Sequence, residues 1–280
     1  MLTMATASAA ATASSYSTRW RPELNAAVAD AALPNATFPS HCALAVVGAG
    51  WGGAYLAWRL SVDTNTFNAS DVCIFEANGR VGGRIYSIHG LPNFADLAVD
   101  VGGYRFQETQ RLPADLVWSA LKLPTQCYDW QCAQKCEGTT CYVIKDAYGN
   151  NHGYATGIET MLGEVEAAAG VGKKGVFFST RLTKVTPAPL VSPSAARLTF
   201  AGGQSVTADT VLLNLPGNAI EGLDKSSLLF AGPANVSRAL NSVWTFPSRP
   251  AGLQSARPRR RCALTPWRRA HANARGRGRR

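Results

Sequence analysis

Three glycines near the start of the chain have the spacing of a loop that binds a diphosphate. Gly48, Gly50 and Gly53 follow the apolar run 43–47 and precede the helical pattern 54–60. In such a loop the first glycine permits a tight turn, the second lets a diphosphate approach the backbone, and the third lets the helix pack closely on the strand. The phosphates then lie against N–H groups at the positive end of the helix. The expected contacts in this loop are Gly48, Gly50, Trp51, Gly52 and Gly53.

An acidic residue follows the next apolar run. Glu76 and Ala77 come directly after the run 72–75, and a carboxylate at such a strand end accepts hydrogen bonds from the hydroxyls of an adenosine ribose. Strand, glycines, helix, second strand and acid occur in the order of a Rossmann-like unit, which makes the motif far more specific than its glycines alone. The run 43–47 is typical of a strand buried on both faces. The sequence therefore predicts a doubly wound α/β fold.

A pair of glycines after Glu76 favours a flavin cofactor over a nicotinamide cofactor. After Glu76 the chain reads Arg80-Val-Gly82-Gly83-Arg84, and this string resembles the second dinucleotide signature of the flavin amine oxidase family, most closely that of L-amino acid oxidases. In that family the arginine at the position of Arg84 faces the pyrophosphate of FAD, which a guanidinium suits by charge and geometry. The resemblance implies FAD as cofactor. An ordinary surface charge is the alternative for Arg84.

Another pair of glycines lies in the stretch 98–106. A short apolar strand ends there in Gly102 and Gly103, so the backbone must approach another group closely. In the flavin amine oxidases a similar stretch lies along the isoalloxazine and the phosphates. Arg105 resembles the arginine with which L-amino acid oxidases hold the substrate carboxylate, where bidentate pairing supplies charge and orientation together. A structural salt bridge to a nearby acid is the alternative for Arg105.

Strand periodicity returns over residues 176–216, with a hairpin turn at Gly202-Gly203. In the family a β-meander of this kind returns to the nucleotide domain, and a backbone amide near its start holds the adenine. The matching position is Leu182, and a backbone contact tolerates leucine where the family more often has valine.

Composition and pattern divide the chain into six expected segments. They are a targeting or disordered leader (1–40), the first part of the FAD-binding domain (41–110), a helical substrate insert with a cysteine-rich loop (111–175), the return to the FAD-binding domain (176–216), a partial substrate-domain segment (217–248) and a disordered Arg-rich tail (249–280). Helices are expected over 113–123 and 158–169. The substrate domain is expected to be incomplete, because the family's C-terminal FAD motif is not found after residue 248.

The resemblance implies oxidative deamination of an L-amino acid to a keto acid, ammonia and hydrogen peroxide, with dioxygen as second substrate. The flavin carries this chemistry, so no protein acid or base is assigned, and His152 is given no role. One alternative is a monoamine or polyamine oxidase or a related flavin desaturase, whose substrate needs no carboxylate clamp at Arg105. The other is an inactive flavin-domain fragment.

The positive charge of the chain is confined to its end. The formal net charge is +10, but eleven arginines and no acid lie from Arg249 onward, which leaves residues 1–248 at about −1. A basic tail binds polyanions without specificity, so no specific nucleic-acid partner is expected. The charge-free span 39–58 reads as strand, turn and helix rather than as a membrane span.

Four of the seven cysteines are close together, at 127, 132, 136 and 141. Their spacing fits a zinc site poorly, so no metal is expected and local disulfides among these four are the preferred interpretation, with the pairing open. Cys73 lies within the second strand, where a buried small hydrophobe is the simplest interpretation.

The leader is rich in Ala, Ser and Thr and has no acid before Glu23, which suits a targeting segment. Sequons at Asn35, Asn68 and Asn235, together with the cysteine loop, favour the secretory route over a plastid transit peptide.

Overall fold

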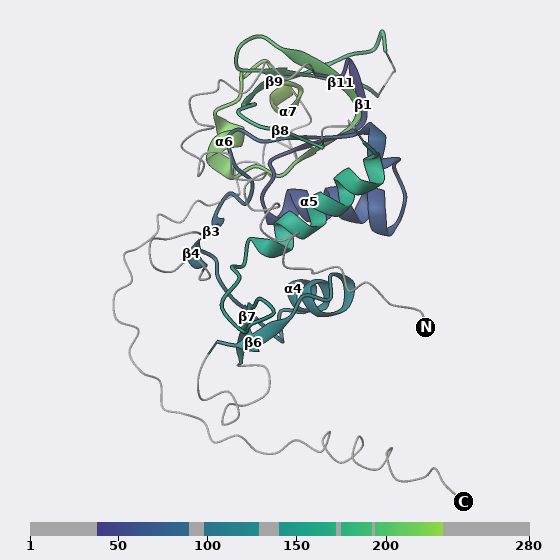
Figure 1. Cartoon of the computed structure of the whole chain (residues 1–280). Coiled ribbons are helices and arrows are strands. Elements are labelled where there is room, and N and C mark those ends of the chain that lie inside the picture. Colours follow the sequence, from purple (N-terminus) through teal and green to yellow (C-terminus); the bar gives the residue numbers. More distant parts are fainter. Residues whose placement is uncertain (1–37, 90–97, 129–139, 172–174, 192–193, 232–280) are drawn as a thin grey trace, which may run out of the picture.

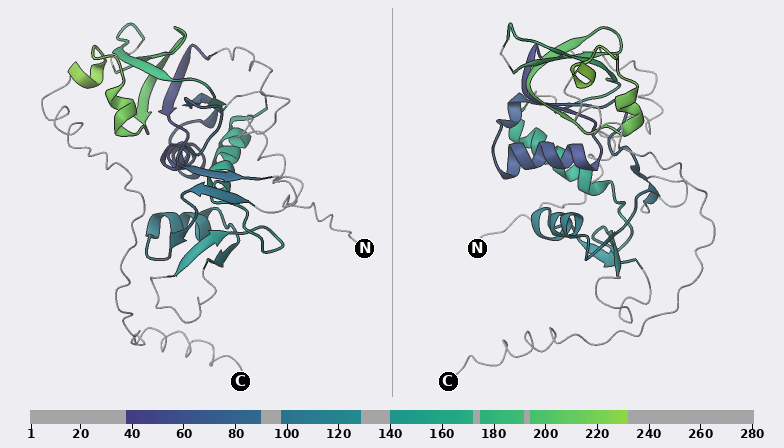
Figure 2. Two further views of the ribbon diagram at one scale, coloured as in Figure 1. Left: turned by 90° about the vertical axis from the view of Figure 1, so that its left-hand side faces the viewer. Right: turned by 180° about the vertical axis from the view of Figure 1, so that it is seen from behind.

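A computed structural model describes residues 38–89, 98–128, 140–171, 175–191 and 194–231 (Figure 1). Most of the expected leader and all of the Arg-rich tail lie outside the described residues. The described part forms three tiers, which the views of Figures 1 and 2 show from several sides: a sheet at the top, a helix pair below it, and a small sheet with a short helix at the bottom.

The top tier is a six-stranded sheet with the order β8-β2-β1-β11-β10-β9. Neighbours β8, β2, β1 and β11 run parallel, and β10 pairs antiparallel with both β11 and β9. The strand bounds are β1 (His41–Val47), β2 (Val72–Phe75), β8 (Val176–Phe177), β9 (Leu182–Pro187), β10 (Ala196–Phe200) and β11 (Ser205–Leu213). The parallel strands confirm the predicted α/β class, and the β10–β11 hairpin turns at Gly202 and Gly203, as expected.

The central strand β1 is buried on both faces, because its side chains alternate between two cores. Leu44 and Val46 belong to the core that faces the helices, whereas Ala45 and Val47 belong to the core on the other side. On that second side, the rings of Phe75 on β2 and Phe200 on β10 have centroids 4.6 Å apart. In a flat sheet two strands so placed would be roughly 14 Å apart, so the sheet curls until β10 lies over β2.

The middle tier consists of two packed helices, α3 (Trp51–Trp58) and α5 (Thr156–Ala169). A π-helical turn (Arg59–Asp63) extends α3, and a 3-10 turn (Ala69–Asp71) leads into β2. The apolar side chains Ile158, Met161 and Leu162 of α5 are fully buried in the core shared with α3. Gly170 ends α5 with a φ of +91°, a conformation that few other residues adopt at a helix end.

The elements of the lower tier lie below these helices, whereas the last two helices of the described chain lie beside the large sheet (Figure 1). A hairpin joins β3 (Ile85–Ile88) to β4 (Val99–Gly102), and β5 (Phe106–Gln107), β7 (Cys141–Ile144) and β6 (Thr125–Cys127) form the small sheet. The helix predicted over 113–123 begins earlier and ends earlier, as α4 (Arg111–Asp115) followed by a π-helical turn (Leu116–Ala120). Two short helices, α6 (Gly217–Glu221) and α7 (Leu228–Ala231), end the described chain.

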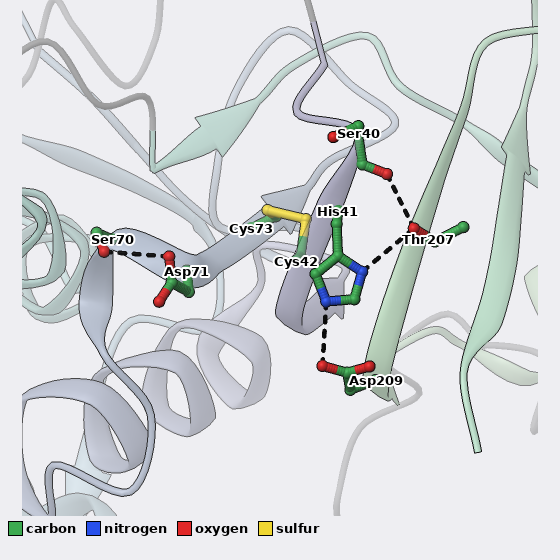
Figure 3. The surroundings of a disulfide bond; sticks show 8 residues. All are labelled: Ser40, His41, Cys42, Ser70, Asp71, Cys73, Thr207 and Asp209. Carbon is green, nitrogen blue, oxygen red and sulfur yellow. Dashed lines mark hydrogen bonds and ion pairs between the residues drawn. A yellow bond between two sulfur atoms is a disulfide. The ribbon is translucent and has the colours of Figure 1, made fainter. Parts of the chain in front are cut away.

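A disulfide that the sequence interpretation missed joins the two strands on which the site is built. Cys42 on β1 and Cys73 on β2 are bonded, with 1% and 5% of their surface exposed (Figure 3). The expectation of Cys73 as a plain buried hydrophobe is therefore wrong, because adjacent parallel strands bring the two sulfur atoms together. On the other side of β1, the His41 ring contacts Thr207 at 3.2 Å and Asp209 at 3.0 Å, both on β11 (Figure 3).

The cysteine loop also differs from expectation. Cys141 is a free thiol buried on β7, so the four cysteines are not all paired among themselves. Cys127 is disulfide-bonded, and Cys132 and Cys136 lie outside the described residues. Within the described ranges, no three or more His, Cys, Asp and Glu side chains are grouped so as to hold a metal ion, and no helix has the length and apolarity needed to cross a membrane.

Candidate dinucleotide site

Three loops meet at one edge of the large sheet. Parallel strands β2, β1 and β11 are neighbours, so their carboxyl ends lie together, which is where open α/β sheets bind ligands. The backbone N–H of Gly48 donates to the carbonyl of Phe75 at 2.7 Å, and that of Asn214 donates to Val47 at 2.8 Å. The residues after each strand are therefore held in register at this edge.

The three glycines of the first loop differ in whether the fold leaves room for a side chain. A Cβ on Gly48, whose φ is +103°, would lie 2.4 Å from the carbonyl oxygen of Asn214, and one on Gly53 would lie 1.8 Å from that of Gly48. The fold itself thus excludes a side chain at both positions. A Cβ on Gly50 would meet nothing closer than 3.8 Å. The chain alone does not require glycine there, whereas a ligand that approaches this backbone does.

Gly50 also begins α3. It is the N-cap residue and provides no side chain to cap the N–H groups of the first turn. No acidic residue lies in that turn. Uncapped N–H groups and the positive end of the helix dipole together favour an anion.

Glu76 connects the end of β2 to the glycine loop. Its side chain, 5% exposed, accepts hydrogen bonds from the backbone N–H of Ala49 at 2.9 Å and from the backbone and side-chain N–H groups of Asn78 at 2.9 and 2.7 Å. A carboxylate has about four acceptor positions, so capacity for a ribose hydroxyl remains. In the structure, the side chain of Glu76 holds the glycine loop in place.

The loop that carries Gly82 and Gly83 contacts the first glycine loop. Gly82 donates to the carbonyl of Ala49 at 2.9 Å, and a Cβ on Gly83 would lie 3.9 Å from the Cα of Gly50. The Arg80 guanidinium stabilises this loop by donating to the carbonyls of Val81 and Gly83, both at 3.1 Å.

Arg84 follows this loop and is exposed. Its guanidinium makes no hydrogen bond or ion pair with any residue that the structure describes.

Gly102 and Gly103 lie against the backbone of Arg84. Gly103 donates to the carbonyl of Arg84 at 3.2 Å, and a Cβ on Gly102 would lie 2.1 Å from that oxygen. The exposed Arg105 follows, with its guanidinium 4.9 Å from the ring centroid of Tyr104 and 5.0 Å from that of Tyr128. Arg105 forms no ion pair with a described residue.

A cavity of about 460 Å³ is lined in part by Tyr104 and Tyr128, the two rings that Arg105 contacts. Its lining residues are Asp100, Tyr104, Gln126, Cys127, Tyr128, Val143 and Asn151. Asp100 is held by the hydroxyl of Ser87, the backbone of Tyr154 and the amide of Asn151, at 2.5, 2.9 and 3.0 Å. The wall on this side of the cavity is therefore fixed by a hydrogen-bond network.

Leu182 begins β9, and the chain that enters β9 lies against the end of β2. Thr180 donates to the carbonyl of Glu76 at 2.8 Å, and Ser179 donates to that of Asn78 at 3.0 Å. The Leu182 side chain is buried in the second core, which leaves only its backbone for a role such as the predicted adenine contact.

One residue of this edge was missed by sequence reasoning. Asn214 directly follows β11, and its side chain lies within 4 Å of the positions that Cβ atoms on Gly50, Gly52 and Gly53 would take. The available signal was a polar residue after the apolar run 211–213, but only the strand order shows that this run is the neighbour of β1.

Comparison with known proteins agrees with the fold. Residues 46–117 match the family model of the NAD(P)-binding Rossmann-like domain. Two molluscan proteins are similar over 63 residues, or 22% of this chain: Aplysianin-A of Aplysia kurodai is 41% identical and Achacin of Lissachatina fulica is 43% identical. The matched stretch spans 10% and 11% of the lengths of these relatives. The N-terminal region is therefore Rossmann-like, and part of it is similar to these two proteins.

Proposed function

We propose that this chain binds FAD and belongs to an oxidoreductase that oxidises L-amino acids. The observation that carries the proposal is the contrast between Gly50, where a Cβ would meet nothing within 3.8 Å, and Gly48 and Gly53, where it would collide with backbone. A glycine that the fold does not need, at an uncapped helix start, indicates a ligand that reaches the backbone.

The described residues fit the parts of FAD in order along the edge. The first turn of α3 and Arg84 would hold the diphosphate, Glu76 and the backbone of Ala77 the ribose, and the backbone of Leu182 the adenine. Gly102 and Gly103 would border the isoalloxazine. When bound, FAD would accept a hydride equivalent from the substrate carbon and pass the electrons to dioxygen.

Arg105 would orient the substrate through its carboxylate. Its guanidinium lies over two tyrosine rings, and such contacts attract a cation without using its N–H donors, which remain for bidentate pairing. The adjacent cavity offers space for a side chain. An amine without a carboxylate would gain nothing from this arginine, so the arrangement favours amino acids over amines.

Two features support passage through the secretory route. The buried Cys42–Cys73 disulfide is typical of proteins that fold in an oxidising compartment. The sequon residue Asn68 is exposed, and its side chain caps the turn before β2 by accepting from the N–H of Ser70 at 3.1 Å. That turn lies at the amino end of β2, opposite the candidate site, so a glycan there would leave the site open.

The test is FAD and ADP titration of the full chain and of Gly50→Val. The parent should bind both ligands, and a side chain at position 50 should weaken both more than about tenfold, because it would occupy the approach of the diphosphate. Gly222→Ala is the matched control, since a Cβ there would contact only the carbonyls of Asn218 and Ala219, at 3.4 and 3.6 Å, and no residue of the glycine loops. No binding by the parent, or equal affinity in Gly50→Val, would refute the proposal.

A further inference from the structure

Asn214 lies at the point where the large sheet changes direction. From β1 the chain crosses by way of α3 to β2 on one side, while β11 is the neighbour of β1 on the other side. Such a switch point creates a crevice at the carboxyl ends of the two strands. Asn214 is the first residue beyond β11 and is fixed there by its N–H bond to Val47 at 2.8 Å.

The side chain of Asn214 fills a space beside the first turn of α3. A Cβ on Gly52 would lie 2.7 Å from its Oδ1 atom, and a Cβ on Gly53 would lie 3.3 Å from its Nδ2 atom. The Nδ2 atom is 3.8 Å from the corresponding position on Gly50. The amide therefore occupies the volume that a side chain at position 52 would take, next to the backbone that the diphosphate approaches.

This amide has hydrogen-bonding groups that the described chain does not use. The residue is half-buried, and its side chain makes no hydrogen bond with any residue in the described ranges. An amide provides two donors and an acceptor, and at this position they are available to a ligand that enters the crevice. A leucine has nearly the same shape and would fill the space equally well, so packing alone does not account for asparagine.

We propose that Asn214 is a third protein contact to the dinucleotide diphosphate, in addition to the first turn of α3 and Arg84. Its side-chain N–H donates to a phosphate oxygen from the β11 side of the crevice. This inference rests on the proposed function. A neutral donor suits this place, because a carboxylate would repel the diphosphate and a longer cation would collide with the first turn of α3.

The test compares ADP with adenosine, which lacks the diphosphate, on the full chain and on Asn214→Leu and Asn214→Asp. A hydrogen bond to a charged group is worth roughly tenfold or more in affinity. We expect Asn214→Leu to weaken ADP about tenfold, Asn214→Asp to weaken it further through repulsion, and adenosine to change less than about twofold in both. Thermal melting of each variant monitors folding, and Asn214→Asp preserves the shape if Asn214→Leu does not fold.

Each outcome separates this inference from the proposed function. Equal losses for ADP and adenosine would show that Asn214 only spaces the loop, and unchanged ADP affinity would show that it makes no contact. Either result overturns the inference and leaves the proposed function intact. If the parent chain binds neither FAD nor ADP, the proposed function itself fails and the inference fails with it.

Discussion

The two halves of the candidate site are built in different ways. In the nucleotide half, defined as β1, α3, β2 and the loop 76–84, the geometry rests on backbone hydrogen bonds, such as Gly48 to Phe75 and Gly82 to Ala49. In the insert, which from here on means the described residues of 98–154, aromatic packing is added to the hydrogen bonds that hold Asp100. Phe106 and Trp118 have ring centroids 5.2 Å apart, and those of Trp118 and Tyr142 are 5.0 Å apart.

The two halves meet at Trp51 and Tyr154, which form the junction between them. Trp51 belongs to the glycine loop, yet its ring stacks on Tyr154 of the insert at 4.8 Å and fills the space beside Gly157 of α5. Backbone geometry tolerates many side chains but no extra atom at a glycine, whereas side-chain packing tolerates a shift but needs particular partners. The two halves should therefore respond differently to the same kind of mutation.

The largest effect is expected from one added methyl group in the nucleotide half. Gly53→Ala places a Cβ 1.8 Å from the carbonyl oxygen of Gly48, so α3 must move away from β1. We expect a loss of about 4 kcal/mol in the free energy of unfolding, at the upper end of single substitutions. Urea denaturation followed by circular dichroism measures it, with Gly50→Ala as control, whose loss should stay below about 1 kcal/mol. Similar losses for both would contradict the separate roles of the two glycines.

The next effect concerns the covalent link within the nucleotide half. Replacing Cys42 and Cys73 together by alanine opens a link between residues 31 positions apart, for which loop-closure entropy predicts a loss of about 3 to 4 kcal/mol. Reductant added to the parent chain should reproduce most of that loss. An unchanged urea midpoint in both experiments would mean that backbone pairing alone stabilises the two strands.

A smaller effect on stability, which depends on pH, is expected from Tyr154 at the junction. Burial raises the pKa of Tyr154 to about 12, above the value near 10 of an unfolded chain, so the folded state retains a proton that the unfolded state releases. This contribution is complete below about pH 10 and is lost as pH rises toward about 12, by about 1 kcal/mol between pH 9 and 11. In Tyr154→Phe, the free energy of unfolding from urea denaturation should therefore fall by about 1 kcal/mol less between pH 9 and pH 11 than it does in the parent chain. An identical decline in the variant would contradict it.

The smallest effect is expected in the insert, and it distinguishes the two arginines. Arg105→Ala should leave ADP affinity unchanged and lower stability by less than about 1 kcal/mol, because the contacts of Arg105 with Tyr104 and Tyr128 are exposed. Arg84→Ala should weaken ADP binding about tenfold without a comparable change in stability. If Arg105→Ala weakened ADP as much as Arg84→Ala, the division between nucleotide half and insert would be wrong.

The sequence by itself determined the nucleotide half. The apolar run that became β1, the glycine spacing, the second strand and Glu76 could all be predicted, because each is a local pattern whose geometry the backbone dictates. The hairpin at Gly202 and Gly203 and the helix that became α5 were predictable for the same reason. Even there, glycine spacing could not show that, of these three glycines, only Gly50 has room for a Cβ, since the collisions at Gly48 and Gly53 arise from packed neighbours.

Only the tertiary structure decided which distant residues meet. Cys42 and Cys73 form a disulfide because β1 and β2 are adjacent and parallel, whereas the proximity of cysteines in the sequence had pointed to a pairing that the free Cys141 contradicts. Asn214 reaches the glycine loop because β11, from the far end of the described chain, inserts beside β1. These contacts depend on strand order, and strand order is set by how all the apolar faces are buried together rather than by any local pattern.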